Sequence, residues 1–215
     1  MQIGVPEINL LLANRMPNKW LSDTKIPTLP ASENRVPVVV VNDFGELPFA
    51  SHSLDLVVLP HVLEFAAEPH QVLREVERVL IPEGQVIVIG FNPASLWGAR
   101  QLAGRLASVP FPPLEGEFIS LPRLKDWLKL LNMEVGHGHF GCYAPPCTTE
   151  KWLGRFGFME NAGSRWWPFL GAVYAVQAIK RVKGMRLIGP VWRKPSVNAP
   201  KVVPATNKMH NDTES

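Results

Sequence analysis

The feature that most constrains the fold is a pair of short apolar runs on either side of one helical pattern. Residues 54–59 (LDLVVL) and 85–90 (QVIVIG) are rich in β-branched residues, which is typical of strands covered on both faces of a parallel sheet. The helix between them is predicted to begin at Glu68 and Pro69 and to end before residues 82–84 (PEG), which favour a turn. Its apolar residues recur at helical spacing: Val72, Val76, Val79 and Leu80. Such a unit has a right-handed crossover, so we expect the two strands to lie parallel.

Other segments extend this unit into an α/β sheet. Residues 38–41 (VVVV) predict a further buried strand, and residues 121–131 carry a short amphipathic helix after a proline-rich loop. Residues 133–142 and 173–182 have the pattern of paired strands that close a sheet edge, separated by a helix over residues 148–158.

Polar residues follow three of the predicted strands at the point where each strand ends. Asp43, His61 and Asn92 occupy these positions. In an open α/β sheet, ligands bind in the crevice outside the carboxyl ends of the strands. We therefore expect the three side chains to point at one crevice.

The segment from Asp43 to Pro93 carries a resemblance to a known family. Its sequence DFGELPFASHSLDLVVLPHVLEFAAEPHQVLREVERVLIPEGQVIVIGFNP resembles the second half of class I S-adenosylmethionine-dependent methyltransferases of the type 11 family, with the pattern D-x-x-x-L-P-F, S-F-D-L-V, V-L-x-H-x-x-D-P and R-V-L-K-P-G-G. The resemblance implies a Rossmann-like, mostly parallel sheet of the seven-stranded type with helices on both faces and an incomplete N-terminal part. It also implies S-adenosylmethionine as cofactor and methyl transfer as the reaction.

The resemblance implies roles for single residues. Asp43 matches the acid that accepts a hydrogen bond from the adenine amino group, Phe44 matches the neighbour whose backbone amide meets the ring, and Leu59 joins the cofactor-binding set. Because that amine is donor-only, a carboxylate suits it. The alternative for Asp43 is a turn cap. Phe65 stands where the family pattern has a histidine, which removes one polar contact near the site.

The front end of the chain departs from the family pattern. The family opens with a strand and a loop close to D-x-G-x-G-x-G, whose glycines let backbone amides approach the cofactor. Here Gln2 takes the position of the acid and Gly4 that of the first glycine, and the remaining glycines are absent. Residues 7–13 then begin the following helix. Our hypothesis is that an N-terminal segment is missing or that the chain is a degenerate relative.

Asp23 lies 19 residues after Gly4. That distance is close to the family spacing for the acid that binds both ribose hydroxyls, a bidentate contact that suits a carboxylate. Its alternative role is that of a loop residue or helix cap.

Methyl transfer is an in-line displacement, so the protein's main task is to hold the nucleophile and the methyl group collinear. A base helps when the acceptor is a hydroxyl, an amine or an acidic carbon, and His61 is the candidate for this catalytic role. The alternative for His61 is a cap on the helix that follows Pro60. Asn92 is a candidate substrate contact, with a turn before Pro93 as its alternative.

We predict no metal site. His137, His139, Cys142 and Cys147 lie close in sequence (HGHFGCYAPPC), but their spacing fits no common zinc module. Two cysteines are too few for a disulfide framework and fit a reducing compartment.

Composition limits the partners and the compartment. The chain has 215 residues, is 46% hydrophobic and carries a net charge of +3, a charge too small to predict nucleic-acid binding. No stretch reaches the apolar length of a membrane span and no signal peptide is evident, so we expect a cytoplasmic protein. The aromatic run that includes Trp152, Phe156, Phe158 and RWWPFLGAVY is core or, alternatively, a peripheral membrane surface for a lipid-like acceptor.

The sequence as a whole predicts a methyltransferase-like domain over residues 1–192 and a disordered proline-rich tail over residues 193–215. We expect a methyltransferase that acts on a small or lipid-like molecule. The alternative is a non-catalytic methyltransferase-like binding module, for which the missing glycines argue. The sequence leaves the acceptor and the oligomeric state open.

Overall fold

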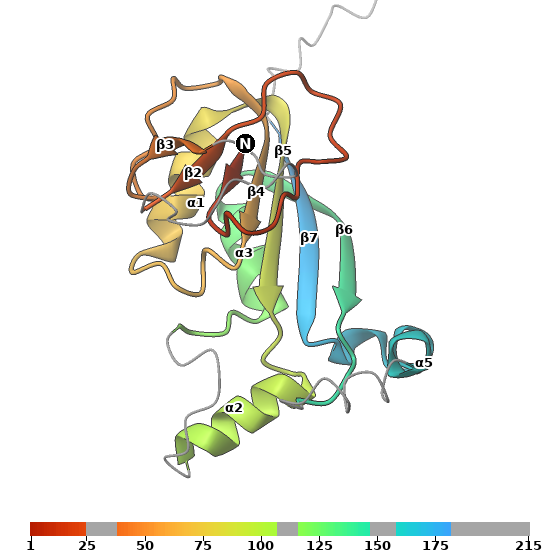
Figure 1. The fold of residues 1–215 in the computed structure, drawn as a ribbon. Helices are drawn as coiled ribbons and strands as arrows, with labels where there is room; N and C mark the ends of the chain where they lie inside the picture. Colours follow the sequence, from red (N-terminus) through yellow and green to blue (C-terminus); the bar gives the residue numbers. More distant parts are fainter. Residues whose placement is uncertain (25–37, 107–115, 147–157, 182–215) are drawn as a thin grey trace, which may run out of the picture. The chain divides into compact units, whose positions relative to one another are not determined.

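The computed structural model describes residues 1–24, 38–106, 116–146 and 158–181. All the described elements belong to one compact unit, Met1–Val182 (Figure 1). The boundary predicted at residue 192 and the tail beyond it lie outside the described residues.

The described strands form one seven-stranded sheet in the order β3-β2-β1-β4-β5-β7-β6. The first five strands in the chain run parallel, and β7 runs antiparallel to both of its neighbours, β5 and β6. The mostly parallel α/β sheet predicted from the sequence is therefore confirmed. The strands are β1 (Gln2–Ile3), β2 (Leu21–Asp23), β3 (Val38–Val41), β4 (Leu54–Pro60), β5 (Leu80–Phe91), β6 (Met133–Gly141) and β7 (Val173–Lys180).

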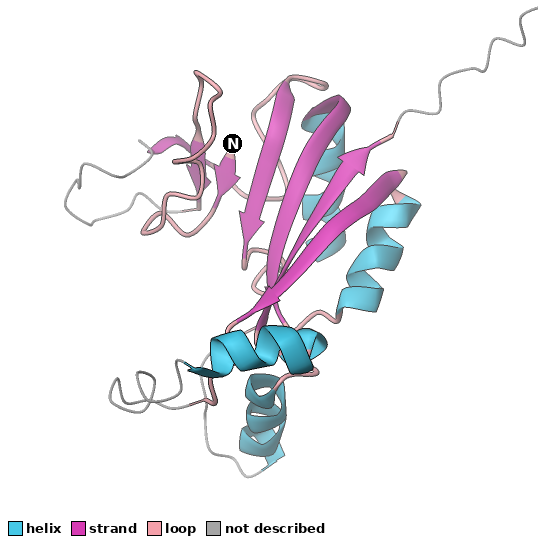
Figure 2. Ribbon diagram, turned by 90° about the vertical axis from the view of Figure 1, so that its right-hand side faces the viewer, coloured by secondary structure: helices cyan, strands magenta, loops and turns pink. Residues whose placement is uncertain are grey.

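The helices occupy two regions of the unit. Those that pack on the sheet are α1 (Pro69–Val79) and α3 (Leu121–Leu130), and Figure 2 shows both on the same side of it. Beyond the carboxyl ends of β4 and β5 lie α2 (Leu96–Leu106), α5 (Phe158–Trp166) and the short 3-10 helix η1 (Pro168–Leu170). No helix in the described part of the chain has the length and apolar character needed to cross a bilayer.

The core explains why the apolar runs are strands. Along β5, Val86 and Val88 are fully buried in the cluster that also contains the apolar faces of α1 and α3. Ile87 points the other way, because side chains alternate along a strand, and packs with Leu11 and Val58 on the opposite face. Both faces of the central strands are thus covered, and a polar residue there would lose its hydration without gaining a partner.

Two predicted elements agree with the structure in type and differ in detail. The helix predicted from Pro69 ends at Val79, and Leu80 already begins β5. Residues 82–84 lie within the span of β5 as an irregular excursion, since Leu80 pairs with Leu54 and the next paired residue, Gln85, with Leu56. Glu83 has a φ of 63°, the left-handed conformation of a turn residue.

The helix predicted from residue 7 is wrong. Residues 7–13 form turns, because side chains bind the backbone groups that a helix would need: Asn9 Oδ1 accepts the amide of Leu11 at 3.1 Å, and Gln2 binds two further backbone groups of this loop. The helix α2 was not predicted. Of the helix predicted over residues 148–158, only Phe158 is described, and it is the first residue of α5.

Candidate functional site

A pocket lies at the point where the strand order of the sheet reverses. The chain fills the sheet outward from β1 through β2 to β3, and then returns to place β4 on the other side of β1. Such a switch point leaves a crevice at the carboxyl ends of the strands. The pocket there has a volume of about 820 Å³, within the range of cofactor sites. It is lined by residues 4–7, 23–24, 43–46, 60–62, 65–68 and 71–72.

Gly4 forms part of the pocket wall at the end of β1. Its φ is +74°, and a Cβ atom there would lie 3.1 Å from Cγ2 of Val62, so the close approach of the two segments needs a glycine. Val5 follows with a φ of 49°, which is an outlier for a β-branched residue. The backbone of this loop therefore turns sharply beside the pocket.

Gln2 holds that loop from behind and does not line the pocket. The side chain is fully buried, and its Nε2 donates to the carbonyl oxygens of Gly4, Val5 and Ile8 at 3.1, 2.9 and 2.8 Å. Its Oε1 accepts the amide of Leu10 at 3.0 Å. The structure thus gives this residue a loop-supporting position, whereas the sequence assigned it to the cofactor.

Asp23 and Asp43 reach the pocket from neighbouring strands. Asp23 ends β2, and its Oδ1 accepts the amide of Thr24 at 2.6 Å. Asp43 is exposed, and its Oδ1 accepts the amide of Gly45 at 3.2 Å, which closes an Asx turn. Asp43 therefore forms a turn and lines the pocket at the same time, so the two roles weighed for it do not exclude each other. Phe44 lines the pocket beside it.

Asn42 positions this turn and was missed by sequence reasoning. Its Oδ1 accepts a hydrogen bond from Ser22 Oγ at 2.6 Å, and its Nδ2 donates to the carbonyl oxygens of Asp43 and Glu46 at 2.6 and 2.9 Å. One side chain thus ties the end of β2 to the loop that carries Asp43.

His61 lies in the pocket wall directly after β4. It has a φ of 53°, its ring stacks on Phe91 with centroids 4.1 Å apart, and its Nδ1 lies 3.4 Å from Glu64 Oε1. Its side chain is 24% exposed. The described structure assigns it no helix-capping contact, since residues 63–65 form a turn.

Two of the predicted site residues lie away from the pocket. Leu59 is completely buried in the core cluster. Asn92 is also buried, and its Nδ2 donates to the carbonyl oxygens of Phe169 and Gly171 at 2.8 and 2.9 Å, while its Oδ1 accepts the amide of Ala94. Of the three strand-end residues expected in one crevice, Asp43 and His61 line it and Asn92 does not. The reason is that β7 runs antiparallel to β5, so the turn that leads into β7 lies at the end of β5 and binds Asn92.

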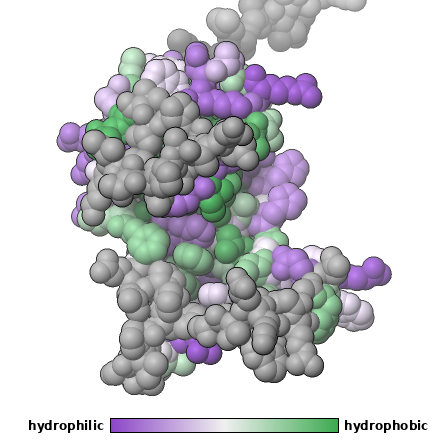
Figure 3. Space-filling view, in the orientation of Figure 1, coloured by the Kyte–Doolittle hydropathy of each residue, from purple (hydrophilic) through white to green (hydrophobic). Residues whose placement is uncertain are grey.

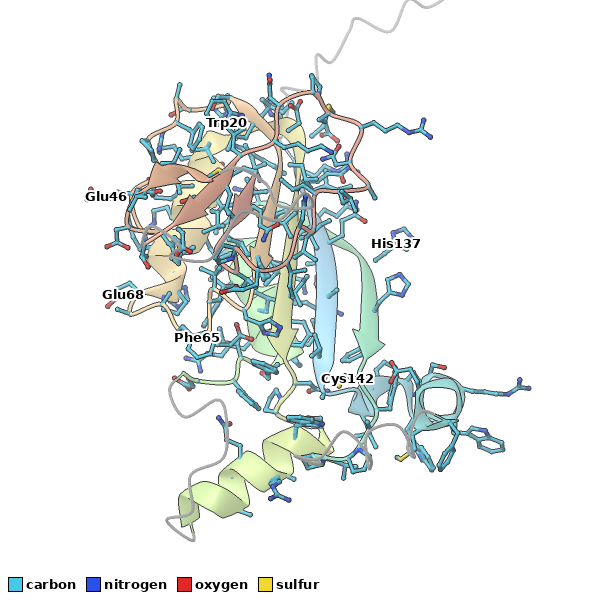
Figure 4. The ribbon with its side chains drawn as sticks, in the orientation of Figure 1. Trp20, Glu46, Phe65, Glu68, His137 and Cys142 are labelled. Carbon is cyan, nitrogen blue, oxygen red and sulfur yellow. The ribbon has the colours of Figure 1, made fainter. Side chains whose placement is uncertain are left out.

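The charge of the pocket is acidic. Among its described lining residues there is no Lys or Arg, and carboxylates come from five positions: Glu7, Asp23, Asp43, Glu46 and Glu68. Figure 4 shows Glu46 and Glu68 on the same side of the molecule as Phe65, a half-exposed residue that lines the pocket. In the space-filling view, hydrophobic surface gathers across the middle of this face, below a largely hydrophilic upper part (Figure 3). The pocket therefore suits a ligand with a cationic centre and an apolar neighbour.

The residues weighed as a metal site do not converge. His137 and His139 are exposed on β6, and Figure 4 separates His137 from Cys142. Burial raises the pKa of the Cys142 thiol, which disfavours the thiolate that a metal needs. Within the described ranges, no three His, Cys, Asp or Glu side chains gather in a metal-binding group. Cys147 lies outside those ranges.

The pocket fits S-adenosylmethionine at its nucleoside end. Asp23 and Asp43 place acceptors at two strand ends, and the missing side chain of Gly4 leaves room beside Val62. The fit is poorer in the first loop, where Pro6 and Ile8 occupy the remaining glycine positions of D-x-G-x-G-x-G, and proline has no amide to donate.

Comparison with known proteins agrees with this geometry. Residues 21–88 match the family model described as "Methyltransferase domain". The uncharacterized protein YafS of Escherichia coli is 36% identical over 171 residues, which cover 80% of this chain. The chain spans 65% of the length of that relative. The demethylmenaquinone methyltransferase of Chlamydia pneumoniae is 33% identical over 52 residues, 24% of this chain and 23% of the relative.

Solved structures share the fold. An S-adenosylmethionine-dependent methyltransferase from Thermotoga maritima has a TM-score of 0.50 at 19% identity, with 67% of this chain and 65% of that chain covered. One from Archaeoglobus fulgidus has a TM-score of 0.50 at 16% identity, with 75% of each chain covered. Residues 21–88 thus match a methyltransferase domain, and the described sheet has the fold of these S-adenosylmethionine-dependent methyltransferases.

Proposed function

We propose that the pocket binds S-adenosylmethionine and that the chain transfers its methyl group to a small or lipid-like acceptor. The observation that carries the proposal is the meeting of Gly4, Asp23, Asp43 and Phe44 in one pocket, from three different strand ends. The three segments that carry these residues are far apart in sequence, and each residue is one that the family resemblance assigns to the cofactor.

The roles follow from the chemistry of each side chain. Asp43 accepts a hydrogen bond from the adenine amino group, Asp23 accepts both ribose hydroxyls, and Gly4 lets the backbone approach the amino-acid part. The acidic lining favours the positively charged sulfonium over neutral analogues. His61 is the candidate base for an acceptor that must lose a proton.

Isothermal titration calorimetry with S-adenosylmethionine tests the binding. We expect Asp43→Asn to weaken affinity about 10- to 100-fold, the value of one charge-assisted hydrogen bond. Asparagine keeps the Asx turn with Gly45, so the loss isolates the carboxylate. Asp126→Asn is the matched control, because Asp126 is exposed on α3 and outside the pocket. No binding by the unaltered chain would contradict the proposal.

An apolar acceptor is supported by the surfaces next to His61. Phe91 stacks on Phe118 with ring centroids 5.1 Å apart, and Phe65 is half exposed at the pocket. The partial likeness to a demethylmenaquinone methyltransferase favours a planar, lipid-like molecule of the same kind as that enzyme's named substrate.

We also propose that such an acceptor is reached at a lipid surface. An aromatic segment, residues 158–170, includes α5 and η1 and has its large apolar side chains exposed beside Arg165: Phe158, Trp166, Trp167, Phe169 and Leu170. Aromatic rings with a neighbouring cation suit the interface of an anionic membrane.

A second candidate function is that of a non-catalytic methyltransferase-like module. It is favoured by the first loop, where both polar atoms of the Gln2 side chain bind the loop backbone and the later glycines are absent. This candidate predicts no heat of binding with S-adenosylmethionine or S-adenosylhomocysteine, so the same titration separates the two functions.

A further inference from the structure

Glu64 is the one acid among the buried polar residues of the described chain. Its side chain is 2% exposed, and its Oε1 accepts the amide of Phe91 at 2.6 Å. Its Oε2 has no hydrogen-bond partner within the residues that the structure describes. Burying a carboxylate with one oxygen unpaired is costly, so its presence in a native fold calls for an explanation.

The structure makes a specific space for this carboxylate. Gly90, on β5, lacks the Cβ atom that would lie 3.0 Å from Glu64 Oε1 and 2.6 Å from Tyr174 Oη. Tyr174 donates its hydroxyl to the carbonyl oxygen of Ile119 at 2.9 Å, so that proton is not available to Glu64. Burial and the charge of Glu64 raise the pKa of Tyr174, which keeps the phenol neutral.

Besides Phe91, the hydrogen-bond partner of Glu64 among the described residues is His61, which approaches the same oxygen, Oε1. Its Nδ1 lies 3.4 Å from Oε1, a long hydrogen bond of the kind that shortens when a ligand binds. Phe91 contacts both members of the pair: its amide donates to Glu64, and the centroid of its ring lies 4.1 Å from that of the His61 imidazole. The imidazole is thus held at one nitrogen and along one face, which leaves Nε2 for the pocket that His61 lines.

We propose that Glu64 is a positioning residue that accepts the Nδ1 proton of His61 and so presents the unprotonated Nε2 as a proton acceptor. The proposal rests on the methyltransferase function above. A buried acid that fixes one tautomer of a histidine base, and stabilises the imidazolium that forms, is a recurrent arrangement.

The proton and electron balance is as follows. Bound S-adenosylmethionine supplies an electrophilic methyl group whose carbon–sulfur bond breaks with its electron pair going to sulfur. Nε2 of His61 takes the proton of the acceptor, whose electron pair forms the new bond to the methyl carbon. The imidazolium that results lies against Glu64 and returns its proton to solvent. The acceptor is therefore a molecule with an acidic hydroxyl, amine or carbon, such as a phenol or a quinol.

Histidine tautomers are measured by two-bond ¹H–¹⁵N correlation on the ¹⁵N-histidine-labelled chain, at about pH 8, where an ordinary imidazole is neutral. We expect His61 to carry its proton on Nδ1 in the unaltered chain. In Glu64→Met, which has a similar length and no acceptor, we expect the proton to move to Nε2. His137, exposed on β6, is the internal control and should not change.

The outcomes separate this proposal from the function on which it rests. Calorimetry with S-adenosylmethionine should give affinities within about threefold for the two chains, since Glu64 does not line the cofactor pocket. No binding by the unaltered chain contradicts the methyltransferase function, whatever the tautomer. A proton on Nε2 in the unaltered chain overturns the role of Glu64, and this holds even where the variant fails to fold.

Discussion

At the scale of single residues, Gly90 decides how closely two buried side chains approach β5. A methyl group there would lie 2.6 Å from Tyr174 Oη and 3.0 Å from Glu64 Oε1. Both residues are buried, so neither side chain has solvent beside it into which it could move. The glycine is therefore required by packing and by the geometry of the His61–Glu64 pair.

We expect Gly90→Ala to lower the free energy of unfolding by about 2–3 kcal/mol, as overpacking of a dense core does. Urea denaturation measures the change. Gly138→Ala on β6 is the control, because its nearest neighbours would lie 3.7 Å from the added carbon, and it should stay within about 0.5 kcal/mol of the unaltered chain. Equal effects of the two substitutions would contradict this account.

At the scale of elements, Arg78 fastens α1 to the loop between β3 and β4. Its guanidinium donates to both carboxylate oxygens of Glu75 at 2.8–3.1 Å. It also donates to the carbonyl oxygens of Leu47 and Phe49, both at 2.9 Å. Glu75 Oε2 also accepts the amide of Leu47 at 3.2 Å. Because Asp43 lies in the same loop, the cluster supports the pocket from the helix.

The hydrogen bonds from Arg78 lower the folded-state pKa of Glu75 below its ordinary value of 4.5. Its carboxylate therefore stabilises the fold at pH values above 4.5, and this stabilisation is lost as pH falls through the folded-state pKa. We expect Glu75→Gln to cost about 1 kcal/mol at about pH 7, and the cost to fall as the pH is lowered through the folded-state pKa of Glu75, measured by urea denaturation.

Glu117→Gln is the control for this prediction. Glu117 pairs with Arg123 at 3.4 Å, but their side chains are 76% and 55% exposed. An exposed pair contributes at most a few tenths of a kcal/mol, so its loss should be small across the same pH range. A cost of Glu75→Gln that persists unchanged at low pH would contradict the ionic origin.

The aromatic segment gives a second prediction at this scale. Replacing Trp166, Trp167 and Phe169 together with serine should reduce co-sedimentation with phosphatidylcholine–phosphatidylglycerol vesicles several-fold, because the rings supply apolar area at the interface. Leu130→Ser on α3 is the control, since Leu130 is exposed and lies outside the segment. Absence of vesicle binding by the unaltered chain would exclude the membrane proposal.

At the scale of the whole molecule, ligand binding at the sheet switch point should stabilise the entire unit. The pocket joins segments that follow β1, β2, β3 and β4, so a ligand held there links most of the parallel half of the sheet. With S-adenosylmethionine at 100 times its dissociation constant, mass action adds about 2.7 kcal/mol.

For a chain of this size, that free energy corresponds to a rise in melting temperature of about 5–10 °C. Differential scanning fluorimetry measures the rise, and Asp43→Asn should reduce it at the same ligand concentration while Asp126→Asn should not. A rise of equal size in the two variants would show that the ligand binds elsewhere.

The sequence by itself determined those strands and helices whose apolar pattern lies within one continuous segment of the chain. Residues 38–41, 54–59 and 85–90 were predicted as strands because they are short, continuous apolar runs, and α1 was predicted as a helix because its apolar residues recur about every 3.6 residues. Parallel strands end at the same edge of the sheet, so the shared position of Asp43 and His61 also followed from the order of elements along the chain.

Only the tertiary structure decided which side chains meet across the sheet. Glu64 reaches the amide of Phe91, 27 residues away, and Asn92 binds the turn before β7, 77 and 79 residues away. No local pattern signals these contacts, because strand order and register bring distant residues together, and a buried polar group is satisfied by whichever partner that register supplies.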